Sequence, residues 1–485
     1  MLSHLWRIII GGYKAIYFMS VFWIASYLII SGGVCFAQNR NNPNLSEQRI
    51  KELLSDSTLI PRREVRNTDT IPAGIKYTEI RAADPLSPPA IIDIAGNFKN
   101  IKAFKLSDIA SSVRYVILQP PPDSKFTAVT GMVSDDEHIF INSWKGLFCY
   151  SPSGQFLYTV VKNVSEETPN GTAQISGTLY FSNIDLLNGK LVARIYEDGI
   201  NMNLSFFDVS EMDAQRRFSF LPQEVQTIGA EPQYQRQIRG HPFFMPSLLL
   251  NNDLSLTGSN LIITSQYGDT LCKFNDYDTY TIPRGQGVAR RLNSKIYRYE
   301  GHVMLQKELN DTVFRMTPPN RLTPVYVMQW GKNKPDIQYY MTLGNLDGKL
   351  LLKDWVESHR YIFIYYTEGS DTPQSRSADK TKDHWAIYDK TVKTLTHHVA
   401  DKVALKEINS SMKFKRPMPA VIENDVEPVG MPFWPEGINH RGEMYMVFSK
   451  SDVKIYLDSG KFPKEKLQAI YDKMPDDSFC LMIVK

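Results

Sequence analysis

A short aromatic loop near the C-terminus has the clearest potential to bind a ligand. The segment 431–437 places prolines on both sides of Phe433 and Trp434. Because proline fixes the backbone angle φ, we expect both rings to lie on a stiff loop outside any strand. A ring that loses little conformational entropy suits stacking against a sugar or a peptide. The sequence therefore predicts a ligand-binding site at Phe433 and Trp434, with the alternative that Trp434 fills a seam between structural units.

Three further tryptophans are candidates for the same role, and each has the same packing alternative. They are Trp144, Trp330 and Trp385. Trp385 follows His384 directly after the polar segment 367–383, which we expect to be a mobile hairpin tip. These five aromatic residues form the predicted binding set.

The sequence contains no strong catalytic motif. It has no His-Glu-x-x-His, no Gly-x-Ser-x-Gly and no phosphate-binding glycine loop, so no catalytic residue is predicted. The adjacent pair His397 and His398 is expected on a strand, where neighbouring side chains point to opposite faces. Such a pair does not easily share one metal ion, and packing is the expected role.

Acidic clusters raise the question of a calcium site. They lie at 135–137, 275–278 and 423–425 and offer carboxylate and amide oxygens, which calcium prefers. None of them has the spacing of an EF-hand loop, so we expect solvated hairpin tips and no cofactor. The alternative to a protein without a cofactor is one that binds calcium, although no sequence motif supports it.

The elements that position these residues follow a recurring strand-pair pattern. An aromatic residue and a polar turn recur at Tyr150, Phe207, Phe274, Phe314 and Tyr388. A unit that recurs every few tens of residues cannot bury its own apolar face and must stack on copies of itself. Five markers and one C-terminal unit predict an all-β, six-bladed β-propeller.

Closure of the propeller is expected to join the two ends of the domain. The apolar run 479–484 is predicted to pair near 91–94 or 113–118, which removes free strand edges. The run 361–366 is almost wholly apolar and is predicted to be buried on both faces. Only one later segment, 461–471, has the spacing of a helix.

The N-terminus has the pattern of an export signal. Arg7 and Lys14 precede the apolar stretch 17–30, and small residues lead to a cleavage site after Ala37. The predicted domains are therefore a signal peptide at 1–37, a flexible linker with a short helix at 38–90, and the propeller at 91–485. Lipidation of Cys35 is the alternative to cleavage, and retention of the segment as a membrane anchor is another.

The overall charge and the remaining cysteines argue against a nucleic-acid-binding protein, a disulfide-stabilised protein and a cysteine metal site. Lys and Arg number 55 against 52 Asp and Glu, a net charge of +3, so no broad basic excess indicates nucleic-acid binding. Cys149, Cys272 and Cys480 are far apart and odd in number, which predicts neither a disulfide framework nor a metal site.

Four segments together resemble a known group of proteins. They are the run 105–118, the Asp-Thr hairpins at 269–274 and 311–316, and the acidic turn 474–478 before the last strand. The chain resembles the six-bladed, TolB-like β-propeller proteins of unknown function that anaerobic Gram-negative gut bacteria encode in many copies. The resemblance implies export to the periplasm or cell envelope and transfers no catalytic residue.

The function predicted from these observations is a non-catalytic binding or scaffold protein of the cell envelope. Its partner would be an envelope protein or a glycan, and membrane association would require a retained N-terminus or a lipidated Cys35. The alternative is a metal-dependent hydrolase or a carbohydrate-active lyase with Glu, Asn and Asp from separate blades in the central channel, an arrangement without a local sequence signature. The sequence gives neither the ligand, the propeller face used nor the oligomeric state.

Overall fold

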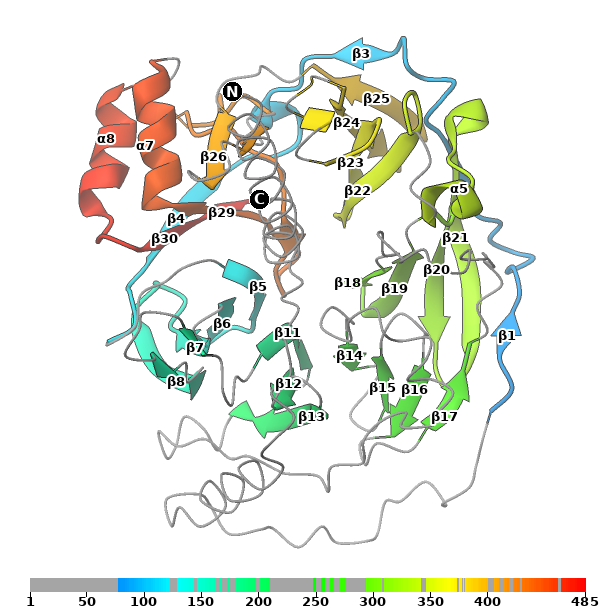
Figure 1. The fold of residues 1–485 in the computed structure, drawn as a ribbon, viewed down its shortest axis with the longest axis horizontal. Helices are drawn as coiled ribbons and strands as arrows, with labels where there is room; N and C mark the ends of the chain where they lie inside the picture. Colours follow the sequence, from blue (N-terminus) through cyan, green and yellow to red (C-terminus); the bar gives the residue numbers. More distant parts are fainter. Residues whose placement is uncertain are drawn as a thin grey trace, which may run out of the picture. The chain divides into compact units, whose positions relative to one another are not determined.

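The protein was studied as a computed structural model, and its described part consists mostly of β-strands (Figure 1). The structure describes residues 77–122, 129–143, 146–162, 166–167, 173–174, 180–187, 189–197, 201–209, 247–249, 254–257, 262–265, 270–274, 294–307, 309–341, 346–372, 375–376, 378, 380–399, 405–409, 414–417, 422–427, 430–460 and 464–485. The predicted signal peptide at 1–37 and the predicted linker helix lie outside these residues.

Four sheets of the described chain each contain four consecutive antiparallel strands, the arrangement of a propeller blade. The first two blades are β5 (Val129–Ser134), β6 (Ile139–Ser143), β7 (Gly146–Tyr150) and β8 (Phe156–Lys162), and β14 (Ser247–Leu249), β15 (Leu254–Thr257), β16 (Ile262–Ser265) and β17 (Thr270–Lys273). The next two are β18 (Ser294–Tyr299), β19 (His302–Lys307), β20 (Thr312–Thr317) and β21 (Arg321–Gln329), and β22 (Leu350–Glu357), β23 (Tyr361–Glu368), β24 (Lys382–Asp389) and β25 (Thr394–His398). The fold is therefore all-β and propeller-like, as predicted.

Two further sheets accompany the four blades. One is the three-stranded sheet of β11 (Tyr180–Leu187), β12 (Lys190–Glu197) and β13 (Asn201–Asp208). The other runs in the order β28 (Gly437–Ile438), β29 (Met444–Ser449), β30 (Phe479–Val484) and β4 (Val113–Leu118). In it the last strand pairs antiparallel with β4, with Cys480 opposite Ile117. The predicted pairing of the C-terminal run with 113–118 is confirmed.

The N-terminal part of the described chain extends two blades at their outer strands. β1 (Ile80–Arg81) and β2 (Ala90–Asp93) both pair in parallel with β21, and β3 (Ile101–Lys102) pairs in parallel with β25. Figure 1 shows this segment in blue along these strands. Residues 80 and 81 thus belong to a sheet, upstream of the predicted propeller boundary at 91.

The core lies in seams between neighbouring sheets, because strands with apolar residues on both faces must be covered on both sides. In β23 every residue from Tyr361 to Thr367 is buried, which confirms the predicted burial of 361–366. One face of this blade packs on β29 and β30, through Phe363 and Phe448 among others. The opposite face packs on the blade β18–β21, through Ile364 and Met328 among others.

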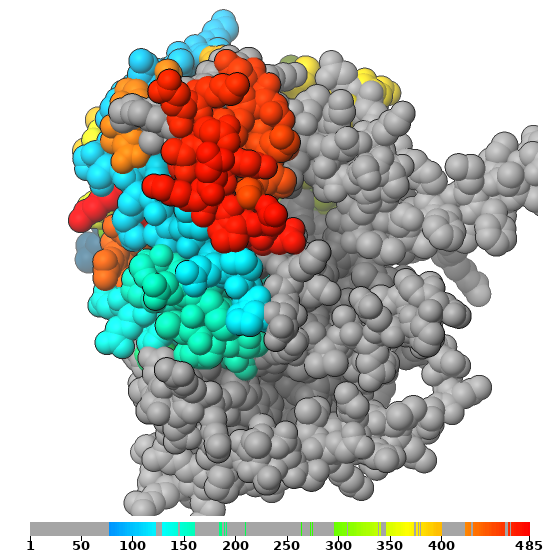
Figure 2. Space-filling model, turned by 90° about the vertical axis from the view of Figure 1, so that its left-hand side faces the viewer, coloured from blue at the N-terminus to red at the C-terminus, as the bar shows by residue number. Residues whose placement is uncertain are grey.

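Two helices connect β29 to β30, whereas the sequence predicted one. α7 (Lys450–Ser459) and α8 (Lys464–Lys473) form part of the surface shown in red and orange in Figure 2. The missed helix α7 begins with a capping box, in which Ser449 and Asp452 each accept from the other's backbone N–H. It ends at Gly460, whose φ of 66° is the left-handed conformation that glycine adopts readily.

The remaining described elements are short. They are the strands β9 (Glu166–Glu167), β10 (Ala173–Gln174), β26 (Leu405–Asn409) and β27 (Phe414–Pro417), the 3₁₀ turns η1 (Leu106–Asp108) and η3 (Gly331–Asn333), and the helix α5 (Ile337–Met341). Within the described residues, no helix is both long and apolar enough to cross a membrane.

Candidate functional site

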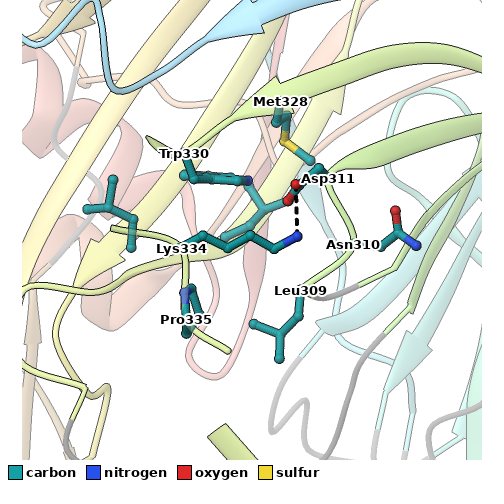
Figure 3. A pocket seen from close by; sticks show the side chains of 9 residues that line it. Leu309, Asn310, Asp311, Met328, Trp330, Lys334 and Pro335 are labelled. Atoms are coloured by element: carbon teal, nitrogen blue, oxygen red, sulfur yellow. Dashed lines mark hydrogen bonds and ion pairs between the residues drawn. The ribbon is translucent and has the colours of Figure 1, made fainter. Parts of the chain in front are cut away.

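A small pocket opens where the blade β18–β21 meets the blade β22–β25 (Figure 3). It lies between the β19–β20 hairpin loop, the segment that follows β21, and the start of β22. Its volume is about 250 Å³, including space open to solvent. The space inside it that a water-sized molecule can occupy is about 10 Å³, which is room for about one water molecule. Its walls are formed by Leu309, Asn310, Asp311, Met328, Trp330, Lys334, Pro335, Leu350 and Leu352.

The hairpin loop is held rigidly, and this fixes the position of Asp311. The Asn310 side-chain oxygen accepts a hydrogen bond of 2.9 Å from the backbone N–H of Thr312. This is the turn-forming behaviour expected of asparagine. The carbonyl of Asp311 accepts a bond of 2.7 Å from the N–H of Met328 on β21. The Asn-Asp-Thr motif recognised in the sequence therefore presents its carboxylate at a fixed place beside β21.

Trp330 forms the aromatic wall of the pocket. It immediately precedes η3, and its side chain is only 6% exposed. Its ring packs edge-to-face on Tyr366 of the next blade, with 5.6 Å between ring centroids. Such aromatic pairs add stabilisation beyond buried area and limit ring movement. The structure thus places the predicted residue Trp330 in a pocket, as a largely buried and oriented wall.

One ion pair and one unpaired oxygen make up the polar part of the pocket. Lys334 donates to Oδ2 of Asp311 over 2.8 Å. The other carboxylate oxygen, Oδ1, is buried and has no hydrogen-bond partner among the described residues. Figure 3 shows the Lys334 side chain beside Trp330, with its amine directed at Asp311. The pocket therefore combines apolar walls with one acceptor that still has bonding capacity.

The other predicted aromatic residues lie elsewhere, and two of them are buried. Phe433 is 0% and Trp434 is 4% exposed, inside the core cluster between β23 and β29. Trp434 packs edge-to-face on Phe363, with centroids 5.4 Å apart. Their burial leaves no open ring face, so the packing alternative describes their surroundings better than a stacking platform does.

Trp385 and Trp144 complete the predicted set. Trp385 is partly buried and stacks on Tyr365, at 5.5 Å and an interplanar angle of 20°. Together with Phe433 and Trp434 it contacts one core cluster, whereas Trp330 belongs to the next seam. Trp144 lies outside the described residues. Among the described candidates, three therefore share one core cluster and Trp330 lies in another.

The segment 367–383, expected to be a mobile tip, is anchored by a buried arginine. The Arg376 side chain is 7% exposed and donates to Asp371 and to both carboxylate oxygens of Asp383. These carboxylates raise the pKa of Arg376, against the opposing effect of its burial. The charge of Arg376 is therefore paired inside the segment, and the mobility of 367–383 stays a prediction.

The histidines of the blade β22–β25 pack as expected for a strand. His397 stacks on Phe98 at 5.3 Å and bonds to the Tyr366 hydroxyl, whereas His398 accepts from the N–H of Phe104. His397 and His398 thus contact different residues, and they do not share a site. Burial lowers the pKa of His397, and the neighbouring His384 lowers it further. Burial also lowers the pKa of His384, although Glu368 opposes this effect.

A buried carboxylate between two blades was not found from the sequence. Glu357 of β22 is 2% exposed and accepts hydrogen bonds from Tyr297 at 2.7 Å and Tyr326 at 2.6 Å. Lys390 lies 3.3 Å from it, and burial lowers the pKa of this lysine despite the glutamate. Burial and the Glu357 charge raise the pKa of both tyrosines. Because these groups come from separate strands, no local motif marks them.

The acidic clusters act mainly as turn caps and ion-pair partners. Asp135 accepts from the N–H groups of Glu137 and His138, and Asp136 pairs with Arg441 at 2.9 Å. Asp425 accepts from Ser107. The cluster 275–278 lies outside the described residues. In the part of the chain that the structure describes, no group of three or more His, Cys, Asp or Glu side chains is arranged to hold a metal ion.

The fold and pocket define an all-β propeller-like protein, and comparison with known proteins places it in a family. Residues 72–459 match the family described as Domain of unknown function (DUF4933), so the chain belongs to that family. No curated protein matches the chain.

Several solved structures are similar to this chain in fold. A protein of Bacteroides fragilis that is thought to be exported is 14% identical, with a TM-score of 0.49, over 81% of this chain and 99% of its own. A member of the DUF4221 family from Bacteroides vulgatus is 7% identical, with a TM-score of 0.37, over 78% and 99%. A protein of unknown function from Bacteroides thetaiotaomicron is 8% identical, with a TM-score of 0.35, over 77% of both chains.

Proposed function

We propose that this protein is a non-catalytic binding or scaffold propeller of the cell envelope, which recognises another envelope protein at the loop end of its blades. The observation that carries the proposal is the loop end of the blades β18–β21 and β22–β25, where the β19–β20 and β23–β24 loops lie together and Tyr339 is 46% exposed.

The position of the pocket within the fold supports this role. The chain crosses from β21 to β22 at the same end of the blades at which the β19–β20 and β23–β24 loops lie, and Gly369 bonds to Lys349 there over 2.8 Å. Loops that a rigid sheet positions are the usual place for binding residues. We therefore assign the recognition surface to the end of the blades that carries these loops.

We infer that the propeller has six blades in a TolB-like arrangement, with β11–β13 and the β28–β29–β30–β4 sheet as the two additional blades. Core clusters connect β4 and β30 to the blade β5–β8, and that blade to β11 and β12. β14 contacts both β11 and β12. This sequence of contacts supports a closed ring, in which the last strand pairs with a strand near the start of the domain.

Export and an envelope location belong to the same proposal. Arg7 and Lys14, the apolar stretch that follows and the small residues up to Ala37 support a signal peptide. Mass measurement of the mature protein would test it. A mature chain that begins at residue 38 agrees with cleavage after Ala37, whereas a lipid-modified Cys35 or an intact N-terminus would replace this part of the proposal.

The binding function is tested by site-specific photo-crosslinking in cells. A photoreactive amino acid at Tyr339, which is 46% exposed near the pocket, is compared with one at Val392, which is 60% exposed in the β24–β25 turn at the other end of the blade. We expect one defined protein adduct from position 339 that is absent from position 392, and purified partner that binds in calorimetry. Adducts from neither position, or equally from both, would contradict the proposal. A purified protein that binds a glycan panel instead would assign the site to a glycan.

A further inference from the structure

We propose that Lys390 and Glu357 join covalently after folding, by an amide bond between the lysine Nζ and the glutamate Cδ, with loss of one water molecule. The bond would connect the end of β22 to the β24–β25 turn of the same blade. It is a modification site beyond the proposed binding function and does not depend on it. The contact between the two side chains, their burial and the hydroxyl groups around them carry the inference.

The folded blade holds the two side chains in contact. The Lys390 Nζ lies 3.3 Å from Oε1 of Glu357 and donates a 2.6 Å hydrogen bond to the Ser358 carbonyl. The backbone N–H of Lys390 donates to the carbonyl of Arg360, which fixes the turn, and the Nζ lies 3.8 Å from the centre of the Tyr299 ring. Two groups held in one geometry react far faster than the same groups free in solution.

Burial makes the charged pair costly and protects the product. The Glu357 side chain is 0% exposed and that of Lys390 is 15% exposed. Burial lowers the pKa of Lys390, although the charges of Glu357 and Glu300 oppose this effect. Transfer of one proton from Lys390 to Glu357 removes both charges from the seam and leaves a neutral amine, the form that acts as a nucleophile. Because bulk water does not contact the carboxyl group, the amide is protected from hydrolysis once it has formed.

Two tyrosine hydroxyls are placed to stabilise the transition state. Tyr326 donates to Oε1 of Glu357 over 2.6 Å, and Tyr297 donates to Oε2 over 2.7 Å. Attack of the amine on Cδ moves negative charge onto a carboxyl oxygen, and a hydroxyl bonded there stabilises that charge as in an oxyanion hole. The N–C bond forms, one C–O bond breaks, and the leaving hydroxyl takes a proton from the amine. One water molecule is released, and no other reactant is needed.

A second lysine–glutamate pair in the same blade lacks these features. Lys382 donates to Glu368 over 3.1 Å, a shorter distance, but the lysine side chain is 66% exposed and that of the glutamate 29%. Among the described residues, the Glu368 carboxylate is paired with Lys382 and His384 and accepts from no tyrosine. Solvent hydrates both charges, so we expect this pair to stay an ion pair. It is therefore an internal control for the effect of proximity alone.

The test is peptide mapping of the purified, folded full chain by mass spectrometry after digestion with trypsin. Trypsin does not cleave after a lysine whose amine is acylated. The peptide 354–360 should therefore appear joined to 383–393, lighter by one water molecule than the two together. Fragmentation should place the branch at Glu357 and Lys390. No branched peptide should join Lys382 to Glu368.

Two variants separate the covalent bond from the ion pair. Lys390→Arg keeps a positive charge beside Glu357, but its guanidinium stays protonated and is not a nucleophile, so the branched peptide should disappear. Tyr326→Phe keeps the ring and removes the hydroxyl on Oε1. In a pulse-chase experiment it should slow formation of the branched peptide on the order of 100-fold. Tyr299→Phe is the matched control and should leave the rate unchanged, because the Tyr299 hydroxyl bonds to Glu300.

Unmodified peptides 354–360 and 383–390 from the folded wild-type chain would overturn the inference. A branched peptide of equal abundance at the control pair would also overturn it, because it would indicate condensation without regard to burial. A Tyr326→Phe chain that forms the bond at the wild-type rate would overturn the role assigned to the hydroxyl. Because the peptide map reads a covalent bond within the chain, its result is independent of the photo-crosslinking test of the proposed function.

Discussion

The indole Nε1 of Trp355 donates a 2.7 Å hydrogen bond to the phenolic oxygen of Tyr297, which connects the first strands of two neighbouring blades. The Tyr297 hydroxyl in turn donates to Glu357, which also accepts from Tyr326. A chain of bonds thus crosses the seam from β22 to β18 and returns to β22. Trp355, Glu357 and Tyr326 are buried and Tyr297 is partly buried, so loss of the central carboxylate leaves both tyrosine hydroxyls without their acceptor.

Replacing the carboxylate at the centre of this chain should be strongly destabilising. Glu357→Ala leaves the hydroxyls of Tyr297 and Tyr326 without their acceptor, and it removes the ion-pair partner of Lys390, whose amine keeps its bond to the Ser358 carbonyl. We expect a loss of about 3–5 kcal/mol in the free energy of unfolding, measured by urea denaturation. Asp476→Ala, which removes an ion pair with Lys450 at the fully exposed surface, is the control and should leave the denaturation midpoint unchanged. Equal midpoints for both variants would show that the Glu357 network contributes nothing.

Stability should fall on mild acidification because of two buried histidines. Burial lowers the pKa of His384 and of His397, so both are neutral in the folded protein at pH 7. The unfolded chain takes up these protons as the pH falls through about 6.5, and the folded chain does so only at lower pH. The stabilising contribution is therefore present above pH 6.5 and is lost progressively below it.

The measurement is the midpoint of thermal unfolding between pH 7.5 and pH 5.5. His397→Gln should flatten this dependence, whereas His302→Gln, a change at an exposed strand position, should not. Glu368, Lys382 and Asp383 also act on His384, so their charges must stay constant over the chosen range. A steeper dependence in His397→Gln would contradict the predicted direction.

Trp434 should affect the stability of the fold. Its side chain is 4% exposed and packs on Phe363 across the seam. Trp434→Ala should cost about 3–5 kcal/mol, because it removes buried surface and leaves a cavity. Tyr339→Ala, at a 46% exposed position, should change the free energy of unfolding by less than about 0.5 kcal/mol. A Trp434→Ala protein of unchanged stability would return this residue to the list of ligand-binding candidates.

The register of the closing strands can be tested with one new cysteine. Cys480 lies directly opposite Ile117, so Ile117→Cys should form a disulfide with the native thiol. Burial raises the pKa of Cys480 to about 12, so the bond should form during folding in an oxidising compartment and not by later oxidation. The bond should stabilise the fold by up to about 5 kcal/mol, and a reductant should reverse the effect. Arg114→Cys, opposite Ile483, should form no such bond.

The blade pattern was predictable from the sequence because it is local. Tyr150, Phe314 and Tyr388 all lie on the third strand of a blade, in β7, β20 and β24. Each marks a hairpin, and the chemistry of a hairpin turn is contained in a few consecutive residues. The pairing of the two chain ends followed from the need to cover strand edges. Helix α7 had its own signals in Ser449, Asp452 and Gly460, although its apolar periodicity is weak.

The pocket was predictable only in pieces, because it depends on contacts between blades. The Asn-Asp-Thr turn and Trp330 were both recognised, as a hairpin and as an aromatic candidate. Their neighbours Lys334 and Leu350 come from the crossover and from the next blade, and their approach depends on how two sheets pack. The same reason explains why Arg376 was expected in a mobile loop. Its burial requires Asp371 and Asp383, which are distributed over the segment and converge only in the folded hairpin.

The parallel pairing of β1 and β2 with β21 determines how this protein would carry a mechanical load. A pull on the N-terminal side of residue 77 acts along β1, so the bonds from Ile80 to Asn320 and from Ala82 to Leu322 are loaded in shear at the same time. Bonds that share a load break at a higher force than bonds that are peeled apart one after another. The same geometry recurs at β2 and again at β3. The N-terminal strands therefore resist a force that pulls the preceding part of the chain away from the blades.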